Sequence, residues 1–329
     1  MPSLSLTRYE PLLARRLNAY LDRQWDEYLS LEVPAEFMDE FKGLTDGGRS
    51  VHAAMDVGKI AARATVISNF PGDLQNLKFI AEDEWSAVSS SSVDGDSADM
   101  DMDKILQLLQ IRWKGLSCSM FGVWGKRTMN GGVYTGRNLD WLSSTGVSVY
   151  KLVTVYHPPQ GYPHATIGWA GLWGALTGMS SQGISVHEAN LESDDITFRG
   201  FPWVLRLRHV MANAKNIDEA LSLWKQSNNT VGFNHGFGSK NDKQAVCLET
   251  MKGNSAIFSD DDPRERALVV DGRPIGAPRR DAVYRTNHGF DDYSVTHFMW
   301  NHSDPYNYSI ARYMLFPALL DSYEVLNQT

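Results

Sequence analysis

The sequence lacks several features that would identify common classes of protein. It contains only two cysteines, Cys118 and Cys247, which excludes a disulfide framework and a cysteine-rich zinc site. No uninterrupted apolar run reaches transmembrane length, and residues 1–25 carry charges where a signal peptide requires an apolar stretch. No glycine-rich nucleotide loop occurs at the spacing of a strand-helix-strand unit.

Positive charge is also scarce. The 329 residues carry a net charge of −8, and Lys and Arg form no long basic stripe, which argues against a broad electrostatic grip on nucleic acid. With 43% hydrophobic and 21% charged residues, the composition is ordinary for a folded globular protein. Global disorder is therefore excluded, and an enzyme or a binding protein is expected.

The compartment has two interpretations. As written, without a leader, the chain is expected to be cytoplasmic. Four segments fit the N-glycosylation pattern Asn-x-Ser/Thr, which has meaning only in a secretory compartment; they begin at Asn228, Asn301, Asn307 and Asn327. A lysosomal or secreted location is the alternative if a leader has been removed.

The first 85 residues are expected to form a mainly helical segment. Apolar residues recur at three- and four-residue steps in 8–32, and a second helix is expected at 35–41. A third apolar stripe runs through 51–70. These amphipathic stripes need a partner surface, so the segment is expected to stay bound to the rest of the chain after any cleavage.

Residues 86–103 form the best candidate linker. Ser, Gly and Asp predominate there, and few large apolar side chains are present to order the segment. A calcium loop is less consistent with this stretch, because the glycine at the sixth position and the closing Glu are both absent. Residues 104–329 are then expected to form the second, larger domain.

From Cys118 onward the sequence pattern is typical of an α+β protein. Short runs rich in β-branched and aromatic residues, broken by Gly and Asn, predict strands on both sides of a pair of helices. The expected strands are 119–124, 132–136, 148–156, 165–169, 184–187, 231–238, 244–251 and 254–259, and the expected helices are 202–214 and 217–227.

Cys118 is the best candidate nucleophile. Nineteen residues after it, the segment Gly136-Arg137-Asn138-Leu139-Asp140 delivers an Arg and an Asp three residues apart, which suits a charged pair beside the thiol. No His lies at a familiar spacing to act as base. A cysteine at a chain N-terminus can use its own α-amino group, whose ordinary pKa is about 7.7 to 8.0, as the base. That solution requires cutting the Ser117-Cys118 bond.

These residues resemble the cysteine N-terminal nucleophile hydrolases, which include choloylglycine hydrolase, N-acylethanolamine acid amidase, acid ceramidase and fungal penicillin acyltransferase. In that superfamily a Cys followed by a small hydroxyl residue begins one strand and a Gly-Arg-Asn-Leu/Met-Asp element ends the next. Cys118-Ser119 and residues 136–140 match both elements. The resemblance extends over about 112–315.

The resemblance implies roles for six residues. Cys118 would be the nucleophile, Arg137 would orient its thiolate and Asp140 would hold its α-amino group. Three further residues are placed by order along the chain and local sequence. Asn190 would lie on the oxyanion side, Asn287 of the Thr286-Asn287 pair would contribute the oxyanion hole or position the nucleophile, and Arg312 would close the site.

The fold implied by the resemblance is a four-layer αββα sandwich with the helical N-terminal segment beside it. The implied function is a self-processing amidase that cleaves the carbon-nitrogen bond of an N-acyl compound, with a lipid amide among the candidates. Three alternatives stay open: an acyltransferase that passes the acyl group to an amine, a phospholipase B-like ester hydrolase, and a catalytically silent protein that binds acyl ligands or a partner.

No cofactor and no metal are expected. His297 and His302 do not fit a metalloprotease helix and have no Glu placed to act with them. Trp169, Trp173 and Trp203 suit either an acyl-pocket wall or the core, and the core is preferred for each. Cys247 alternates with apolar neighbours and is interpreted as a buried core residue.

Overall fold

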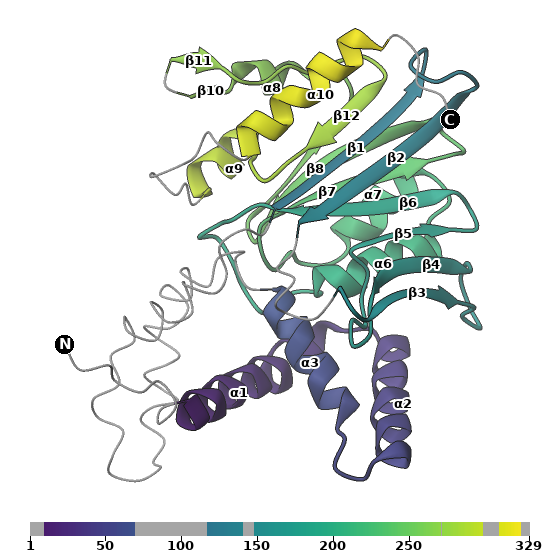
Figure 1. Ribbon diagram of the computed structural model, residues 1–329, viewed down its shortest axis with the longest axis vertical. Coiled ribbons are helices and arrows are strands. Elements are labelled where there is room, and N and C mark those ends of the chain that lie inside the picture. The colour runs from purple at the N-terminus through teal and green to yellow at the C-terminus, as the bar shows by residue number, and fades with distance from the viewer. Residues whose placement is uncertain (1–9, 70–116, 141–147, 271, 299–308, 324–329) are drawn as a thin grey trace, which may run out of the picture.

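The computed structural model describes residues 10–69, 117–140, 148–270, 272–298 and 309–323 (Figure 1). The expected linker at 86–103 lies outside these residues, as do His302 and the glycosylation candidates Asn301, Asn307 and Asn327, whereas Asn228 is exposed. Within the described part of the chain, none of the helices combines the length and apolar character needed to span a membrane.

Helices form the described N-terminal part, as expected. They are α1 (Glu10–Glu27), the short 3-10 helix η2 (Leu29–Glu32), α2 (Ala35–Val51) and α3 (Val57–Ser68). The side chain of Asp56 caps α3 by accepting from the Lys59 N–H. Helix α2 runs past its expected end at 41, although Gly47 and Gly48 weaken a helix. Packing explains the difference, because a side chain at Gly48 would collide with Val57 of α3.

Two antiparallel sheets form the body of the protein. The larger sheet comprises, in spatial order, β3 (Lys151–Tyr156), β4 (His164–Trp169), β5 (Thr177–Ser180), β6 (Ile184–Asn190), β7 (Phe233–Ser239), β8 (Gln244–Met251) and β9 (Asn254–Phe258). The smaller sheet comprises β12 (Ala282–Arg285), β1 (Ser117–Gly125) and β2 (Gly131–Asp140). The sequence did not indicate β12, because four residues are too few to show a periodicity.

The sheets and helices stack in four layers (Figure 1). Helices α6 (Trp203–Asn213) and α7 (Ile217–Lys225) cover one face of the larger sheet, and the smaller sheet packs on its other face. Helix α10 (Ala311–Ser322) covers the outer face of the smaller sheet, where the ring of Phe316 packs against Phe121. The expected αββα sandwich is confirmed.

Short elements join these layers. They are α8 (Pro263–Ala267), β10 (Val269–Val270), β11 (Arg273–Pro274) and α9 (Asp292–His297). The strand β11 pairs only with β10, in a separate two-stranded sheet. These elements connect the larger sheet to β12 and α10, and therefore carry the chain back to the smaller sheet that holds Cys118.

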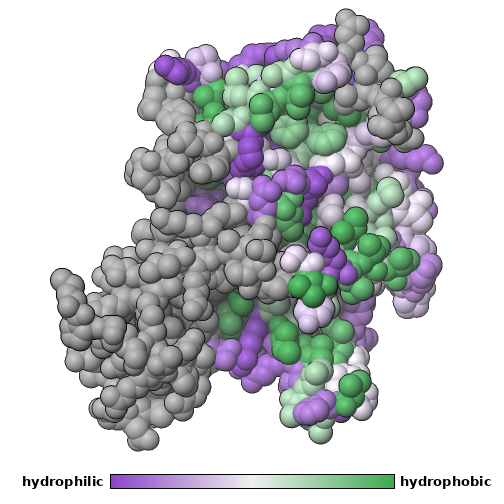
Figure 2. Space-filling model, in the orientation of Figure 1, coloured by the Kyte–Doolittle hydropathy of each residue, from purple (hydrophilic) through white to green (hydrophobic). Residues whose placement is uncertain are grey.

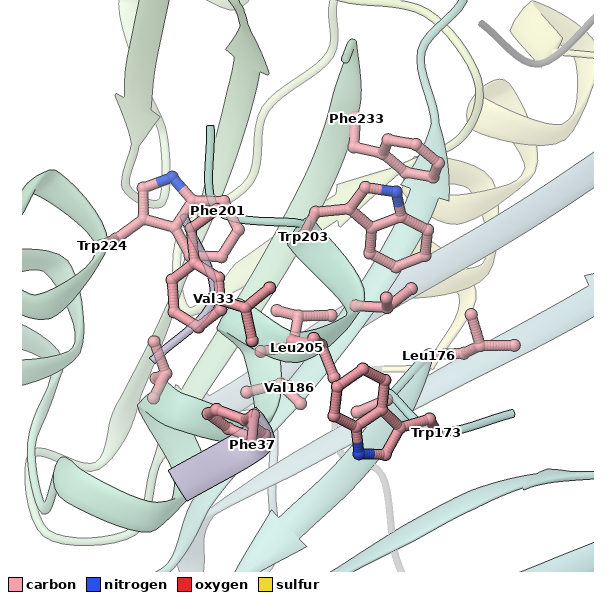
Figure 3. Close-up of a cluster of buried hydrophobic side chains, with 14 of the residues drawn as sticks. Val33, Phe37, Trp173, Leu176, Val186, Phe201, Trp203, Leu205, Trp224 and Phe233 are labelled. Carbon is pink, nitrogen blue, oxygen red and sulfur yellow. The ribbon is translucent and has the colours of Figure 1, made fainter. Parts of the chain in front are cut away.

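The largest apolar core lies between the helices and the larger sheet (Figure 3). It includes Trp173 and Trp203, both nearly inaccessible to solvent, which supports the core interpretation of these two residues. Side chains of the N-terminal helical segment belong to the same cluster. Its labelled members are Val33, Phe37, Trp173, Leu176, Val186, Phe201, Trp203, Leu205, Trp224 and Phe233.

One ion pair ties the N-terminal helices to the sandwich. The guanidinium of Arg208 on α6 is almost fully buried, and its Nη1 and Nη2 donate to the carboxylate of Glu40 on α2 at 2.8 and 2.9 Å. The indole of Trp173 donates to the same carboxylate at 3.0 Å. Burial acts to raise the pKa of Glu40, but the hydrogen bonds and charge of Arg208 outweigh it and hold that pKa below its usual range.

Glu40→Ala is expected to lower the free energy of unfolding by about 2 kcal/mol, because it leaves the buried Arg208 cation without its carboxylate. The loss is smaller than for a fully buried pair, because the Glu40 side chain is partly exposed. Urea unfolding measures the change. Glu36→Ala is the matched control, since Glu36 lies on the same helix, is mostly exposed and approaches His209 only at 3.8 Å. Equal losses in the two variants would contradict the anchoring role of Glu40.

Candidate functional site

Cys118 lies near the start of β1, on the edge of the space between the two sheets. Its side chain is buried, with 5% of the residue exposed. The hairpin to β2 turns at Gly131, whose φ is +67°. Glycine adopts this left-handed conformation without strain because it has no β-carbon. In the resulting register Met120 faces Arg137 and Ser117 faces Asp140. The local sequence therefore brings the thiol and residues 137–140 together.

Arg137 links the thiol to the larger sheet. Its Nη2 donates to Cys118 Sγ at 3.3 Å, and its Nε donates to the main-chain oxygen of Glu188 at 2.8 Å. The same Nη2 also forms an ion pair with the Glu188 carboxylate. Both side chains are nearly inaccessible to solvent. The carboxylate partner of Arg137 is therefore Glu188 of β6.

Arg137 and Asp140 do not pair with each other in the structure, so the two residues keep the separate roles expected for them. Successive side chains of a strand point to opposite faces, so residues three apart on β2 face away from each other. The carboxylate of Asp140 is exposed and accepts from Asn138 Nδ2 at 2.8 Å. It lies close enough to Arg312 to act on that guanidinium electrostatically. Asp140 lies opposite Ser117 in the register of β1 and β2. Its expected contact with the α-amino group would therefore be made at that end of β1.

Asn287 lies two residues after the end of β12, and its side chain holds the main-chain nitrogen of Cys118. Its Oδ1 accepts from the Cys118 N–H at 2.9 Å, and its Nδ2 donates to the main-chain oxygen of Asn190 at 2.7 Å. These neighbours fix which end of the amide is the oxygen. With both ends of the amide occupied, the geometry favours positioning of the nucleophile over donation to an oxyanion.

Two polar side chains, the buried Asn234 and the half-buried Ser309, fix the backbone around Asn287. Nδ2 of Asn234 donates to the main-chain oxygens of Thr286 and His288, at 2.9 and 3.0 Å. The hydroxyl of Ser309 accepts from the Asn287 N–H at 2.8 Å. The loop that carries Asn287 is therefore attached to β7 on one side and to the residues before α10 on the other.

Arg312, in the first turn of α10, completes the group. Its Nη2 donates to Asn287 Oδ1 at 2.7 Å and its Nη1 to Ser119 Oγ at 2.8 Å. Nη1 also donates to the main-chain oxygen of Cys118. Burial lowers the pKa of Arg312, and the nearby Cys118 and Asp140 oppose that shift. Arg312 thus connects the nucleophile to the residue that holds its nitrogen.

Asn190, at the end of β6, contributes its backbone to the site. Its main-chain oxygen accepts from Asn287, and its main-chain N–H acts to lower the pKa of the Cys118 thiol. The side-chain Oδ1 is buried and has no hydrogen-bond partner among the residues that the structure describes. The structure thus brings five of the six predicted residues into direct contact, and it places the sixth, Asp140, at the edge of that group.

The thiol is held in its protonated form in this state. Burial raises the pKa of Cys118 to about 12, the charge of Glu188 raises it further, and Arg137 and the Asn190 N–H act in the opposite direction. A thiol with that pKa contains almost no thiolate at neutral pH. Nucleophilic attack therefore requires a base that accepts the proton at the moment of reaction.

Sequence reasoning missed Glu188 and Asn234. Glu188 is the sole acidic residue in β6, between His187 and Ala189 in a strand that is mostly buried, and a buried carboxylate requires a partner. That was the available signal. Asn234 gave none, because nothing in the sequence shows that β7 lies beside residues 286–288. His297 is outside the site, with its Nδ1 2.8 Å from a carboxylate oxygen of Asp194.

An apolar face of the larger sheet adjoins the site. It consists of Val153, Val155, Ile167 and Met179 on β3, β4 and β5, each more than half exposed, and we call it the β3-β5 face. Figure 2 shows hydrophobic side chains gathered over these strands. The sheet register leads from the face toward the site, because Val153 pairs with Ile167, Ile167 with Thr177 and Thr177 with His187, whose pKa the charge of Arg137 helps to lower.

Comparison with known proteins identifies one family. Residues 127–328 match the acyl-coenzyme A:6-aminopenicillanic acid acyl-transferase family. The match begins after Cys118 and includes Arg137, Asp140, Asn287 and Arg312.

Two curated relatives come from Dictyostelium discoideum. Protein dcd1B is 30% identical over 150 residues, which cover 45% of this chain and 30% of that protein. Protein dcd1A is 28% identical over 158 residues, which cover 45% of this chain and 36% of that protein. The matched part thus spans about a third of the length of these relatives.

Two solved structures are also similar. The Caenorhabditis elegans ortholog of N-acylethanolamine-hydrolyzing acid amidase is 17% identical with a TM-score of 0.38, over 54% of this chain and 73% of that chain. A mutant conjugated bile acid hydrolase from Clostridium perfringens is 14% identical with a TM-score of 0.35, over 54% of this chain and 56% of that chain.

Proposed function

Because this chain belongs to the acyl-coenzyme A:6-aminopenicillanic acid acyl-transferase family, we propose that it is a self-processing enzyme that hydrolyses the amide bond of an N-acyl substrate through an acyl-enzyme on Cys118. Membership of this family confirms the expected relationship to the N-terminal nucleophile hydrolases. The proposal extends this relationship to a reaction, a nucleophile and a class of substrate.

One observation carries the proposal. The main-chain nitrogen of Cys118 donates to Asn287 Oδ1 while its sulfur accepts from Arg137 Nη2, so both ends of the N–Cα–Cβ–S unit are held. In an ordinary buried strand residue the N–H pairs with a main-chain oxygen, and the sulfur of a core cysteine needs no guanidinium beside it. In an N-terminal nucleophile, the nitrogen is the base and the sulfur is the nucleophile, and their relative position determines whether the proton can pass between them.

Self-processing would use the same atoms. The Cys118 sulfur attacks the carbonyl carbon of Ser117, the carbon-nitrogen bond breaks, and the acyl group of residues 1–117 passes to sulfur as a thioester. Water then hydrolyses the thioester, which frees the thiol and leaves a carboxylate on Ser117. The nitrogen that donated to Asn287 becomes the α-amino group, and its ordinary pKa of about 7.7 to 8.0 suits a base near neutral pH.

Substrate turnover would repeat the chemistry on an external amide. The α-amino group accepts the thiol proton, the thiolate attacks the substrate carbonyl, and the leaving amine takes a proton from the ammonium. The main-chain N–H of Asn190, which lowers the pKa of the thiol, is the candidate donor to the oxyanion that forms next to the sulfur. Water completes hydrolysis, whereas an amine acceptor at the same step would complete an acyl transfer.

The β3-β5 face favours an acyl group with a long apolar chain. From His187 the register passes through the half-buried Thr177 on β5 to the exposed aliphatic side chains of Ile167 on β4 and Val153 on the edge strand β3. Each strand adds about 4.8 Å, so the row from β6 to β3 spans roughly 14 Å. An alkyl chain along it would remove apolar surface from water on both sides, at about 0.8 kcal/mol per buried methylene.

The test is product analysis with matched N-acyl amides of butanoic and dodecanoic acid, together with the dodecanoyl ester and an added amine acceptor. We expect kcat/KM to be at least about tenfold higher for the longer amide, free acid as product, and an acyl adduct on Cys118 by peptide mass. Turnover of the ester alone would support the phospholipase B-like alternative. If no substrate is turned over and no acyl adduct forms on Cys118, the proposed enzyme is refuted.

A further inference from the structure

The Arg137–Glu188 pair has a geometry that a simple structural ion pair does not need. Glu188 receives Arg137 twice, through its main-chain oxygen at 2.8 Å and through its carboxylate. The nitrogen that meets the carboxylate also meets the Cys118 sulfur at 3.3 Å. The thiol therefore contacts the Arg137 guanidinium through the same nitrogen that binds the Glu188 carboxylate, so the positive charge next to the sulfur is already balanced by a negative one.

We propose that Glu188 is a positioning residue that holds Arg137 against the thiol and cancels its charge, so that Cys118 stays protonated until a new positive charge forms beside it. That charge is the ammonium produced when the freed α-amino group takes the proton from sulfur. The assignment rests on Cys118 being the proposed nucleophile, and its deciding measurement, the pH midpoint of Cys118 alkylation, requires no substrate.

Among the charged groups around the thiol, Glu188 is the one that balances the charge of Arg137 at the Cys118 sulfur. Arg312 contacts the main-chain oxygen of Cys118, and its charge is partly offset by the electrostatic influence of the Asp140 carboxylate. The buried His187 precedes Glu188, and burial together with Arg137 lowers its pKa to about 4, so it is neutral at physiological pH. The charge balance at the sulfur is therefore set by Arg137 and Glu188.

The charge state of Glu188 follows from its contact with Arg137. Burial raises the pKa of Glu188, and the adjacent guanidinium opposes that shift through its charge and its hydrogen bond. A charge-assisted bond of this kind favours the ionised carboxylate. An ionised Glu188 acts against a thiolate at the same place, which agrees with the raised pKa of Cys118.

The test is the pH dependence of Cys118 alkylation by iodoacetamide, measured by peptide mass so that Cys247 is scored separately. Intact mass first assigns each sample as cleaved or uncleaved, and like is compared with like. Glu188→Gln keeps the shape and an acceptor for Arg137 but removes the charge. We expect its Cys118 alkylation at a fixed pH below the midpoint to be about tenfold faster than in the wild type, a shift of about one pH unit.

Three further variants separate charge from structure. Glu188→Asp keeps the charge and shortens the reach, so its alkylation midpoint should stay near that of the wild type while kcat/KM falls. Arg137→Gln should shift the midpoint upward. If Glu188→Gln does not fold, the double variant Arg137→Gln/Glu188→Gln is compared with Arg137→Gln, and its midpoint should be lower. Unchanged midpoints after loss of the Glu188 charge would overturn the assignment, whatever the outcome for amide turnover.

Discussion

Cys118→Ala is expected to remain a single chain of 329 residues and to lose amide turnover by about 10⁴-fold or more. The wild type is expected to yield fragments of residues 1–117 and 118–329. The loss is large because one atom, the sulfur, forms the bond to carbon in both reactions. Removing it leaves Arg137, Asn287 and Arg312 with no nucleophile to position. Intact-mass analysis at mildly acidic and neutral pH, with an amide assay on the same samples, measures both effects.

Cys247→Ala is the matched control, because the two cysteines are almost equally buried. Burial raises the pKa of Cys247 to about 12 as well, yet its surroundings are the core strands β7 and β9. This variant should cleave and turn over amides like the wild type, at a stability cost of about 1 kcal/mol. Turnover by a wild type that stays uncleaved would refute self-cleavage as the activating step. Full turnover by Cys118→Ala would refute the nucleophile.

The fragments are expected to stay together after cleavage. The N-terminal segment contributes Phe37 to the same core as Trp173 and Trp203, and Glu40 supplies the carboxylate for the buried Arg208. Separating the chains would expose this apolar surface and leave that guanidinium unpaired, both of which are unfavourable. A single peak in size-exclusion chromatography, with two bands under denaturing conditions, is the corresponding observation.

The part of the site predictable from residues alone is the part that is close in sequence. Cys118 and Arg137 are joined by one hairpin, so a local motif brings them together. Asn287 and Arg312 contact Cys118 across 169 and 194 residues of chain. Their positions came from the order of motifs in a family, since no periodicity or spacing in one sequence encodes a contact over that distance.

Glu188 shows where the pattern was misleading. An Arg and an Asp three residues apart suggest an ion pair on a helix or turn, but on β2 they face opposite ways, and the carboxylate came from another sheet. Strand alternation over 132–140 would have excluded the local pair. It would not have found Glu188, because the way the two sheets stack determines which residue of β6 meets Arg137.

Asn287→Leu is expected to lower kcat/KM by about 10²- to 10³-fold and to leave uncleaved chain in the sample. Leucine is similar in size but cannot accept from the Cys118 N–H or donate to the Asn190 main-chain oxygen. It also leaves Arg312 Nη2 without its 2.7 Å acceptor. The nitrogen that must receive the thiol proton would then lack a fixed orientation, while the sulfur would still contact Arg137.

Asn241→Ala is the control for this variant. Asn241 Nδ2 likewise donates to a main-chain oxygen, that of Lys215 at 2.7 Å, but it follows β7 at the end of that strand far from Asn190. Its loss should leave cleavage and turnover within about twofold of the wild type.

Asn287→Asp separates the two tasks of the amide, because it keeps the acceptor for Cys118 and Arg312 and loses only the donor to Asn190. If Asn287→Asp and Asn287→Leu are equally impaired, the donor to Asn190 is the essential contact and the proposed hold on the nitrogen is wrong. If Asn287→Asp retains most of the cleavage, the acceptor at the Cys118 nitrogen is what the site requires.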